Sequence, residues 1–126
     1  MYELSVKGHF DAAHSLIGYP GECKNLHGHT WDVEVTVIGT ELDAIDIIYD
    51  FKDLKADLGS VIEPLDHAYL NEVPPFDTLS PTAENLARVL YDALIERVSD
   101  ATNGRVSLKE VSVWESPIAR ITYRRG

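Results

Sequence analysis

The chain has 126 residues, of which 44% are hydrophobic and 25% are charged, and these are the proportions of an ordinary globular domain. Its formal net charge of −10 argues against a nucleic-acid binder, which needs a basic face, and against an anionic membrane surface as partner. Cys23 is the only cysteine, so no intrachain disulfide can form, and neither a signal peptide nor an apolar run near 18 residues is found. We therefore expect one cytoplasmic domain over residues 1–126.

The N-terminal region predicts two neighbouring strands. Apolar and polar residues alternate from residue 2 to residue 14, which is typical of a strand with one buried face, and this face ends at His14. A second alternating run covers residues 27–38. A hairpin turn through Gly18-Tyr19-Pro20-Gly21 would place the end of the first strand beside the start of the second.

Three histidines lie where these two strands meet. His27 and His29 are two residues apart on one strand, so their side chains project from the same face about 6–7 Å apart. With His14 they supply three imidazoles and an open fourth position, which is the ligand set of a catalytic zinc site. Cys23 lies close by, and the residues alone leave open whether its thiolate is a nucleophile, a base or a fourth ligand that closes a structural site.

Two helices are predicted in the middle of the chain, each with an apolar stripe at helical spacing. Asp50 is a good N-cap for the first helix, which Pro64 closes. The second begins at Ser80-Pro81-Thr82, where either hydroxyl can cap it, and Asn103-Gly104 is a turn signal after it.

Two further strands are predicted at residues 105–115 and 118–124, broken at Ser116-Pro117. Strands at both ends with helices between them favour an α+β fold in the order ββααββ, a four-stranded antiparallel sheet with two helices on one face. Open sheet edges with aliphatic faces invite pairing between subunits.

Two polar features stand out beyond the histidines. Glu115 shares strand parity with Val113, so it should face the core unless the strand bulges, and a carboxylate there needs a partner such as Arg120 or a ligand with two adjacent N–H groups. A frayed strand end in solvent is the alternative. Asp66 beside His67 is a typical setting for a proton shuttle, although a surface histidine in a helix-terminal turn is the simpler interpretation.

Six short segments, in this order along the chain, match one known family. They are Phe10-Asp11-Ala12-Ala13-His14, Cys23-x-x-x-His27-Gly28-His29, Asp50-Phe51-x-x-Leu54-Lys55, Leu65-Asp66-His67-x-x-Leu70-Asn71, Pro81-Thr82-Ala83-Glu84-Asn85-Leu86-Ala87 and Trp114-Glu115-Ser116. On these segments the chain resembles the 6-pyruvoyl-tetrahydropterin synthase family over nearly its whole length. The three residues between Cys23 and His27 are similar to the 6-carboxy-tetrahydropterin synthase branch of queuosine biosynthesis.

The resemblance implies a role for each candidate residue. The implied zinc ligands are His14, His27 and His29; the implied general base is Cys23; the second proton-handling pair is Asp66 and His67; the implied pterin contacts are Glu115 and, in the segment that lines the pocket, Thr82. Two positions depart from the family pattern, since Glu22 stands where a basic residue is common and Asp11 where serine is common.

The resemblance also implies a reaction and an assembly. The reaction is a zinc-dependent lyase step that converts 7,8-dihydroneopterin triphosphate to 6-carboxy-5,6,7,8-tetrahydropterin with release of acetaldehyde and triphosphate. The fold implied is the tunnelling fold, in which three subunits join their sheets into a β-barrel and two trimers stack into a homohexamer. Two alternatives stay open: a 6-pyruvoyl-tetrahydropterin synthase, and a non-catalytic structural zinc module with Cys23 as a fourth ligand.

Overall fold

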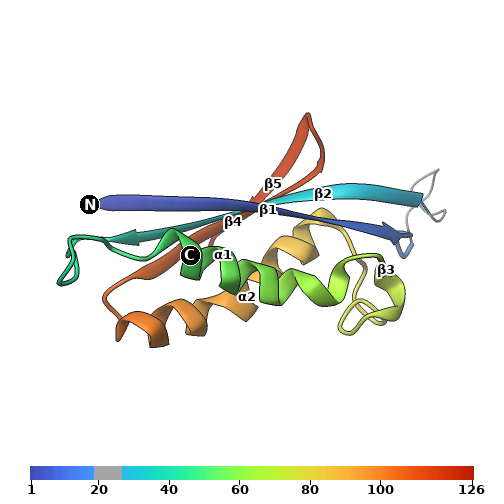
Figure 1. Cartoon of the computed structure of the whole chain (residues 1–126). Coiled ribbons are helices and arrows are strands. Elements are labelled where there is room, and N and C mark those ends of the chain that lie inside the picture. Colours follow the sequence, from blue (N-terminus) through green and yellow to red (C-terminus); the bar gives the residue numbers. More distant parts are fainter. Residues whose placement is uncertain (19–26) are drawn as a thin grey trace.

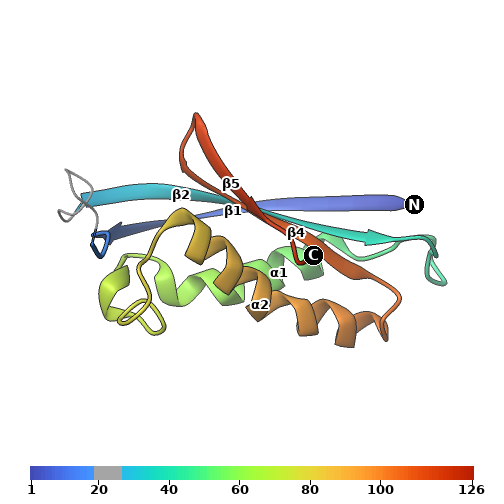
Figure 2. The same ribbon diagram turned by 180° about the vertical axis from the view of Figure 1, so that it is seen from behind.

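A computed structural model describes residues 1–18 and 27–126, and for His27 the backbone only. The described residues form one five-stranded sheet in the order β3-β1-β2-β4-β5. Its strands are β1 (Tyr2–His14), β2 (His27–Gly39), β3 (Ala68–Tyr69), β4 (Ser107–Ser116) and β5 (Ala119–Tyr123). Helices α1 (Phe51–Ile62) and α2 (Ala83–Thr102) lie against the same face of the sheet, as Figures 1 and 2 show from opposite sides. The predicted α+β class and both predicted helices are confirmed.

The predicted strand count was wrong by one. The two-residue strand β3 follows the 3-10 turn Glu63–Leu65 and pairs in parallel with the end of β1, so the sheet is mixed and the order is ββαβαββ. The backbone N–H of His67 donates to the backbone oxygen of Asp11 at 2.6 Å and leads the chain into this pairing. A strand of two residues has no periodicity, which is why the sequence pattern could not indicate it.

The long hairpin of β1 and β2 fixes where the histidines lie. The two strands pair without a bulge from Tyr2 opposite Gly39 to His14 opposite His27. Because side chains alternate across a strand, an unbroken register keeps every second residue of both strands on the helix-covered face. The hairpin therefore carries one apolar face to its open end, where the histidines lie.

The helix starts are set by side-chain caps. The Asp50 carboxylate accepts a hydrogen bond from the backbone N–H of Lys52, as predicted for α1. Of the two candidate caps for α2, Thr82 is the one used: its hydroxyl accepts from the backbone N–H of Asn85 at 3.1 Å. The hydroxyl of Ser80 instead accepts from the backbone N–H of Ile17, which ties the end of the β1 segment to the start of α2.

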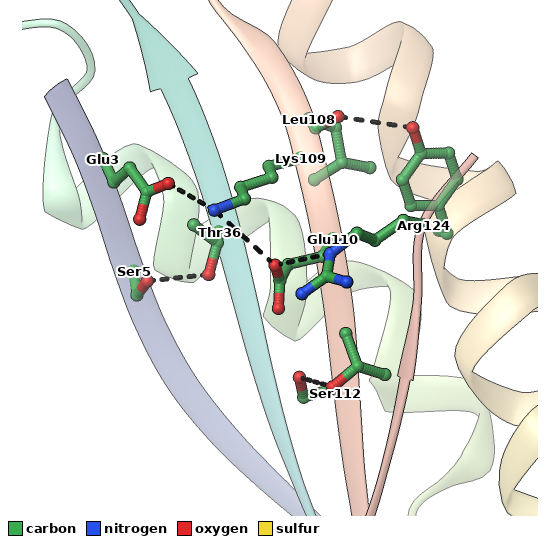
Figure 3. Close-up of polar contacts among 10 residues, drawn as sticks. Glu3, Ser5, Thr36, Leu108, Lys109, Glu110, Ser112 and Arg124 are labelled. Atoms are coloured by element: carbon green, nitrogen blue, oxygen red, sulfur yellow. Dashed lines mark hydrogen bonds and ion pairs between the residues drawn. The ribbon is translucent and has the colours of Figure 1, made fainter. Parts of the chain in front are cut away.

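The two faces of the sheet have opposite character. Val33, Val35, Val111 and Val113 are fully buried between the sheet and the helices. The uncovered face carries hydroxyl pairs, Ser5 with Thr36 and Ser112 with Thr122, and the charged groups drawn in Figure 3. Those charged groups are Glu110 with Lys109 and Arg124, and Lys109 with Glu3. No helix within the described ranges is both long and apolar enough to cross a membrane.

Candidate metal centre and active site

The inward face of the sheet ends in a cluster of rings. The rings of His14 and His29 stand edge to face with their centroids 5.1 Å apart. Both rest against Trp31, whose ring centroid is 4.9 Å from that of His14 and 5.4 Å from that of His29. Since His14 and Trp31 are only 1% and 0% exposed, the packed core holds these side chains in fixed positions.

The start of α2 sets the tautomer of His14. Nδ1 of His14 lies 2.8 Å from the backbone oxygen of Pro81, the residue just before the Thr82 cap. A carbonyl oxygen only accepts, so Nδ1 carries the proton, and in the neutral ring the lone pair is on Nε2. Such a hydrogen bond from the far ring nitrogen is the usual way in which a protein orients a metal-binding imidazole.

Glu115 projects into this cluster from β4. Its Oε1 lies 3.4 Å from Nε2 of His14 and 3.2 Å from Nε2 of His29, and its side chain is 37% exposed. The inward direction predicted from strand parity is therefore confirmed. Arg120, one of the two partners considered for Glu115, does not fill that role. Its guanidinium lies over the ring of Trp114, 5.6 Å from the centroid, on the other face of the sheet.

Part of the predicted site falls outside the described residues. The backbone of His27 pairs with His14, directly opposite it, so its position at the open end of the hairpin agrees with the prediction, but its side chain is not described. Cys23 lies within residues 19–26 and is outside the described chain, as is most of the predicted turn at residues 18–21.

A second polar cluster lies at the edge where β3 meets β1. Ligand-type atoms of Asp11, Asp66 and His67 lie within 4.8 Å of one another. Oδ2 of Asp66 is 3.1 Å from Nδ1 of His67, and Oδ1 accepts a hydrogen bond from the backbone N–H of Asp11 at 3.0 Å. These contacts, that backbone N–H first among them, lower the pKa of the Asp66 carboxyl below its usual value, so the group is ionised at neutral pH.

One open pocket has residues of both clusters in its lining, with His29 alone from the ring cluster. Its lining includes His29 from the ring cluster and His67 from the edge cluster, together with Asp11 and Thr30. Asp11 was not predicted to matter, because it lies on the polar face and departs from the family pattern. The structure shows that its backbone contacts both Asp66 and His67, while its carboxylate accepts from the hydroxyl of Thr30 at 2.5 Å. The contact with Thr30 comes from the pairing of β1 with β2, whereas those with Asp66 and His67 come from the segment that leads into β3, which no local sequence pattern indicates.

Fold and site together define the class: an α+β protein with a candidate histidine–carboxylate metal centre at the open end of a long hairpin, next to an aspartate–histidine pair. The family model described as 6-pyruvoyl tetrahydropterin synthase matches residues 3–126, and the chain belongs to this family.

Individual relatives agree with this membership. The chain is 34% identical to the 6-carboxy-5,6,7,8-tetrahydropterin synthase of Bacillus subtilis, over 98% of this chain and 85% of that protein. It is 36% identical to the dihydroneopterin monophosphate aldolase of Pyrococcus furiosus, over 89% of this chain and 88% of that protein. Among solved structures, the 6-pyruvoyl tetrahydropterin synthase of Caenorhabditis elegans superposes with a TM-score of 0.85 at 27% identity, covering 99% of this chain and 96% of that one.

Proposed function

We propose that this protein is a zinc-dependent lyase that converts 7,8-dihydroneopterin triphosphate to 6-carboxy-5,6,7,8-tetrahydropterin, with release of acetaldehyde and triphosphate. The observation that carries the proposal is the convergence of His14, His29 and Glu115 beside a pocket that His67 also lines. The proposal is also supported by the membership of the chain in the pterin synthase family and by a relative that is named for this activity. The whole chain would then act as one pterin-synthase-like domain in the cytoplasm, within queuosine biosynthesis.

The donor atoms at the open end of the hairpin fit a zinc ion. Imidazole nitrogen and carboxylate oxygen are donors that zinc prefers, and they come here from different strands of a rigid sheet. In the proposal His14, His27 and His29 hold the metal. When bound, zinc supplies a Lewis acid that polarises the side-chain hydroxyls of the substrate and so acidifies the adjacent C–H.

The protein's own groups then bind the ring and move protons. In the proposal the Cys23 thiolate removes the acidified proton, and His67 carries protons at the other side of the pocket. Because Asp66 is ionised, its carboxylate can orient the His67 imidazole through Nδ1. Glu115 accepts hydrogen bonds from the pterin ring N–H groups, and Thr82, which caps α2 beside Pro81, contributes to the pocket wall.

Product analysis tests the proposal. The zinc-loaded protein is incubated with 7,8-dihydroneopterin triphosphate, and mass spectrometry should detect 6-carboxy-tetrahydropterin together with acetaldehyde. A 6-pyruvoyl product would assign the chain to the pyruvoyl-forming activity. The relative from Pyrococcus furiosus makes a parallel incubation with dihydroneopterin monophosphate necessary, and turnover of that compound alone would replace the proposal.

The Cys23→Ala variant separates a base from a ligand. It should keep its zinc while product formation falls by at least about 100-fold, the lower range for a lost acid–base group. Loss of zinc to the extent expected of His14→Ala would instead support the closed structural site.

We also propose that the protein is a homohexamer built from two trimers. Outside the two residues paired with β3, β1 forms an edge of the sheet, and β5 forms the other. Tyr2 and Phe51 line one pocket beside the start of β1 and are 51% and 60% exposed, which is unusual apolar exposure for a surface without a partner. Light scattering should give about six times the chain mass of 14.1 kDa, and a stable monomer at micromolar concentration would contradict the assembly.

A further inference from the structure

Glu115 lies closer to the metal-binding nitrogens than a group reserved for the pterin ring needs to lie. One oxygen, Oε1, is within 3.4 Å of Nε2 of both His14 and His29. Two ligand atoms that are each about 2.1 Å from one zinc ion at the tetrahedral angle are about 3.4 Å apart. The two N–O distances of 3.4 and 3.2 Å therefore leave room for one zinc ion bound by all three atoms.

The protonation of His14 supports the same reading. Its Nδ1 donates to Pro81, so in the neutral ring a lone pair on Nε2 points toward Oε1 of Glu115. Two acceptors at this distance repel each other unless a positive charge lies between them. A proton on the imidazole or a shared metal ion supplies that charge, and the two possibilities predict different effects of removing the carboxylate.

We propose that in the substrate-free protein Glu115 is the fourth ligand of the metal held by the histidines, and that a pterin ring draws this carboxylate off the metal when it binds. The inference rests on the proposed function and adds that binding of the pterin ring is coupled to release of Glu115 from the metal. Recognition of a pair of ring N–H groups uses both carboxylate oxygens. Glu115 cannot offer both oxygens to the ring while Oε1 remains on the metal, so ring binding frees the coordination position that the substrate hydroxyls need.

The first test measures zinc affinity by competition with a chromophoric chelator, without any substrate. Glu115→Gln should bind zinc at least about 10-fold more weakly than the parent, because an anionic ligand is lost. Glu115→Asp keeps the carboxylate and should lie between the two. Glu110→Gln, the matched change on the other face of β4, should bind zinc as the parent does. Parent-like zinc affinity in Glu115→Gln would overturn the inference and leave the proton as the shared charge.

The second test follows the ligand exchange itself. In the Co²⁺-substituted protein, a pterin without a 6-substituent offers the ring N–H groups but no side-chain hydroxyl. At saturation it should change the visible absorption band of the parent, because the carboxylate leaves the metal, and it should cause no such change in Glu115→Gln. A parent band that stays the same at saturating pterin would overturn the exchange.

These tests are independent of turnover. If the parent makes no 6-carboxy product but Glu115→Gln loses zinc affinity, the proposed reaction fails while the ligand assignment stands. If the parent makes the product but Glu115→Gln binds zinc normally, only the ligand assignment fails. Circular dichroism of each zinc-free variant confirms that the compared proteins are folded.

Discussion

The middle of the sheet and its open end use the same inward face in opposite ways. In the middle, residues such as Val33 and Val113 are fully buried against the helices. At the end, the same face of the same strands carries His14, His29 and Glu115. The backbone geometry is common to both regions, so the difference lies in the side chains and in the contacts that compensate their polarity. A carboxylate is stable at the end because it is partly exposed and lies beside two imidazoles, whereas Val113, two residues earlier, is fully buried.

The largest expected effect comes from placing a carboxylate in the middle of the sheet. Val113→Glu puts an unpaired charge at a fully buried position, and we expect a loss of several kcal/mol in the free energy of unfolding. Urea denaturation measures it. Val113→Ala is the control for lost packing and should cost about 1–3 kcal/mol. If the two variants were equally stable, the middle of the sheet would tolerate charge and the contrast would disappear.

The converse change removes a polar group from the end. Zinc at 100 times its Kd should stabilise the parent by about 2.7 kcal/mol, because it binds only the folded state. His14→Ala should lose nearly all of this gain, which denaturation with and without zinc would measure. His9→Ala, an exposed histidine on the polar face, should keep the gain. Equal zinc stabilisation of both variants would place the metal elsewhere.

Trp31 lies at the junction of the two regions. Its Nε1 is buried and has no hydrogen-bond partner among the described residues, so Trp31→Phe removes packing and no hydrogen bond. We expect a loss of about 1–3 kcal/mol in the free energy of unfolding with zinc stoichiometry unchanged. Loss of zinc in this variant would show that the indole positions the imidazoles. Trp31 would then belong to the metal site and not only to the hydrophobic core.

The smallest effect concerns the edge cluster. The pKa of Asp66 is lowered in the folded state, so its contact with the Asp11 N–H is complete above the usual carboxyl pKa and is lost as the pH falls through the lowered value. The NMR shift of the Asp11 amide proton should titrate with a midpoint below 3.8, the ordinary value, and should not titrate in this way in Asp66→Asn. A midpoint at or above 3.8 would contradict the contact.

Local patterns predicted the regular elements well, and the contacts between distant segments poorly. The predicted strands 2–14 and 27–38 agree with β1 and β2 to within one residue, because one buried face imposes a period of two. The inward direction of Glu115 followed from the same period. Its imidazole partners did not, since they depend on the pairing of β2 with β4, which no local pattern encodes.

The cap of α2 and the role of Asp11 show the same limit. Ser80 and Thr82 were equally good caps by sequence, and in the structure the Ser80 hydroxyl is occupied by the distant backbone N–H of Ile17. Asp11 contacts Asp66 and His67 only because the segment leading into strand β3 lies beside it, and that strand is too short to predict.

The order of the proposed metal ligands along the chain has a kinetic consequence. The three histidines belong to one hairpin of consecutive strands, whereas Glu115 enters with β4, near the end of the chain. Pairings between neighbouring segments form quickly and those between distant segments slowly. When the denatured protein refolds with Co²⁺ present, an early spectral change from the imidazoles should therefore precede a later one from the carboxylate. Glu115→Gln should show the early change alone. A single simultaneous change in the parent would mean that the hairpin of β1 and β2 forms only together with the rest of the sheet.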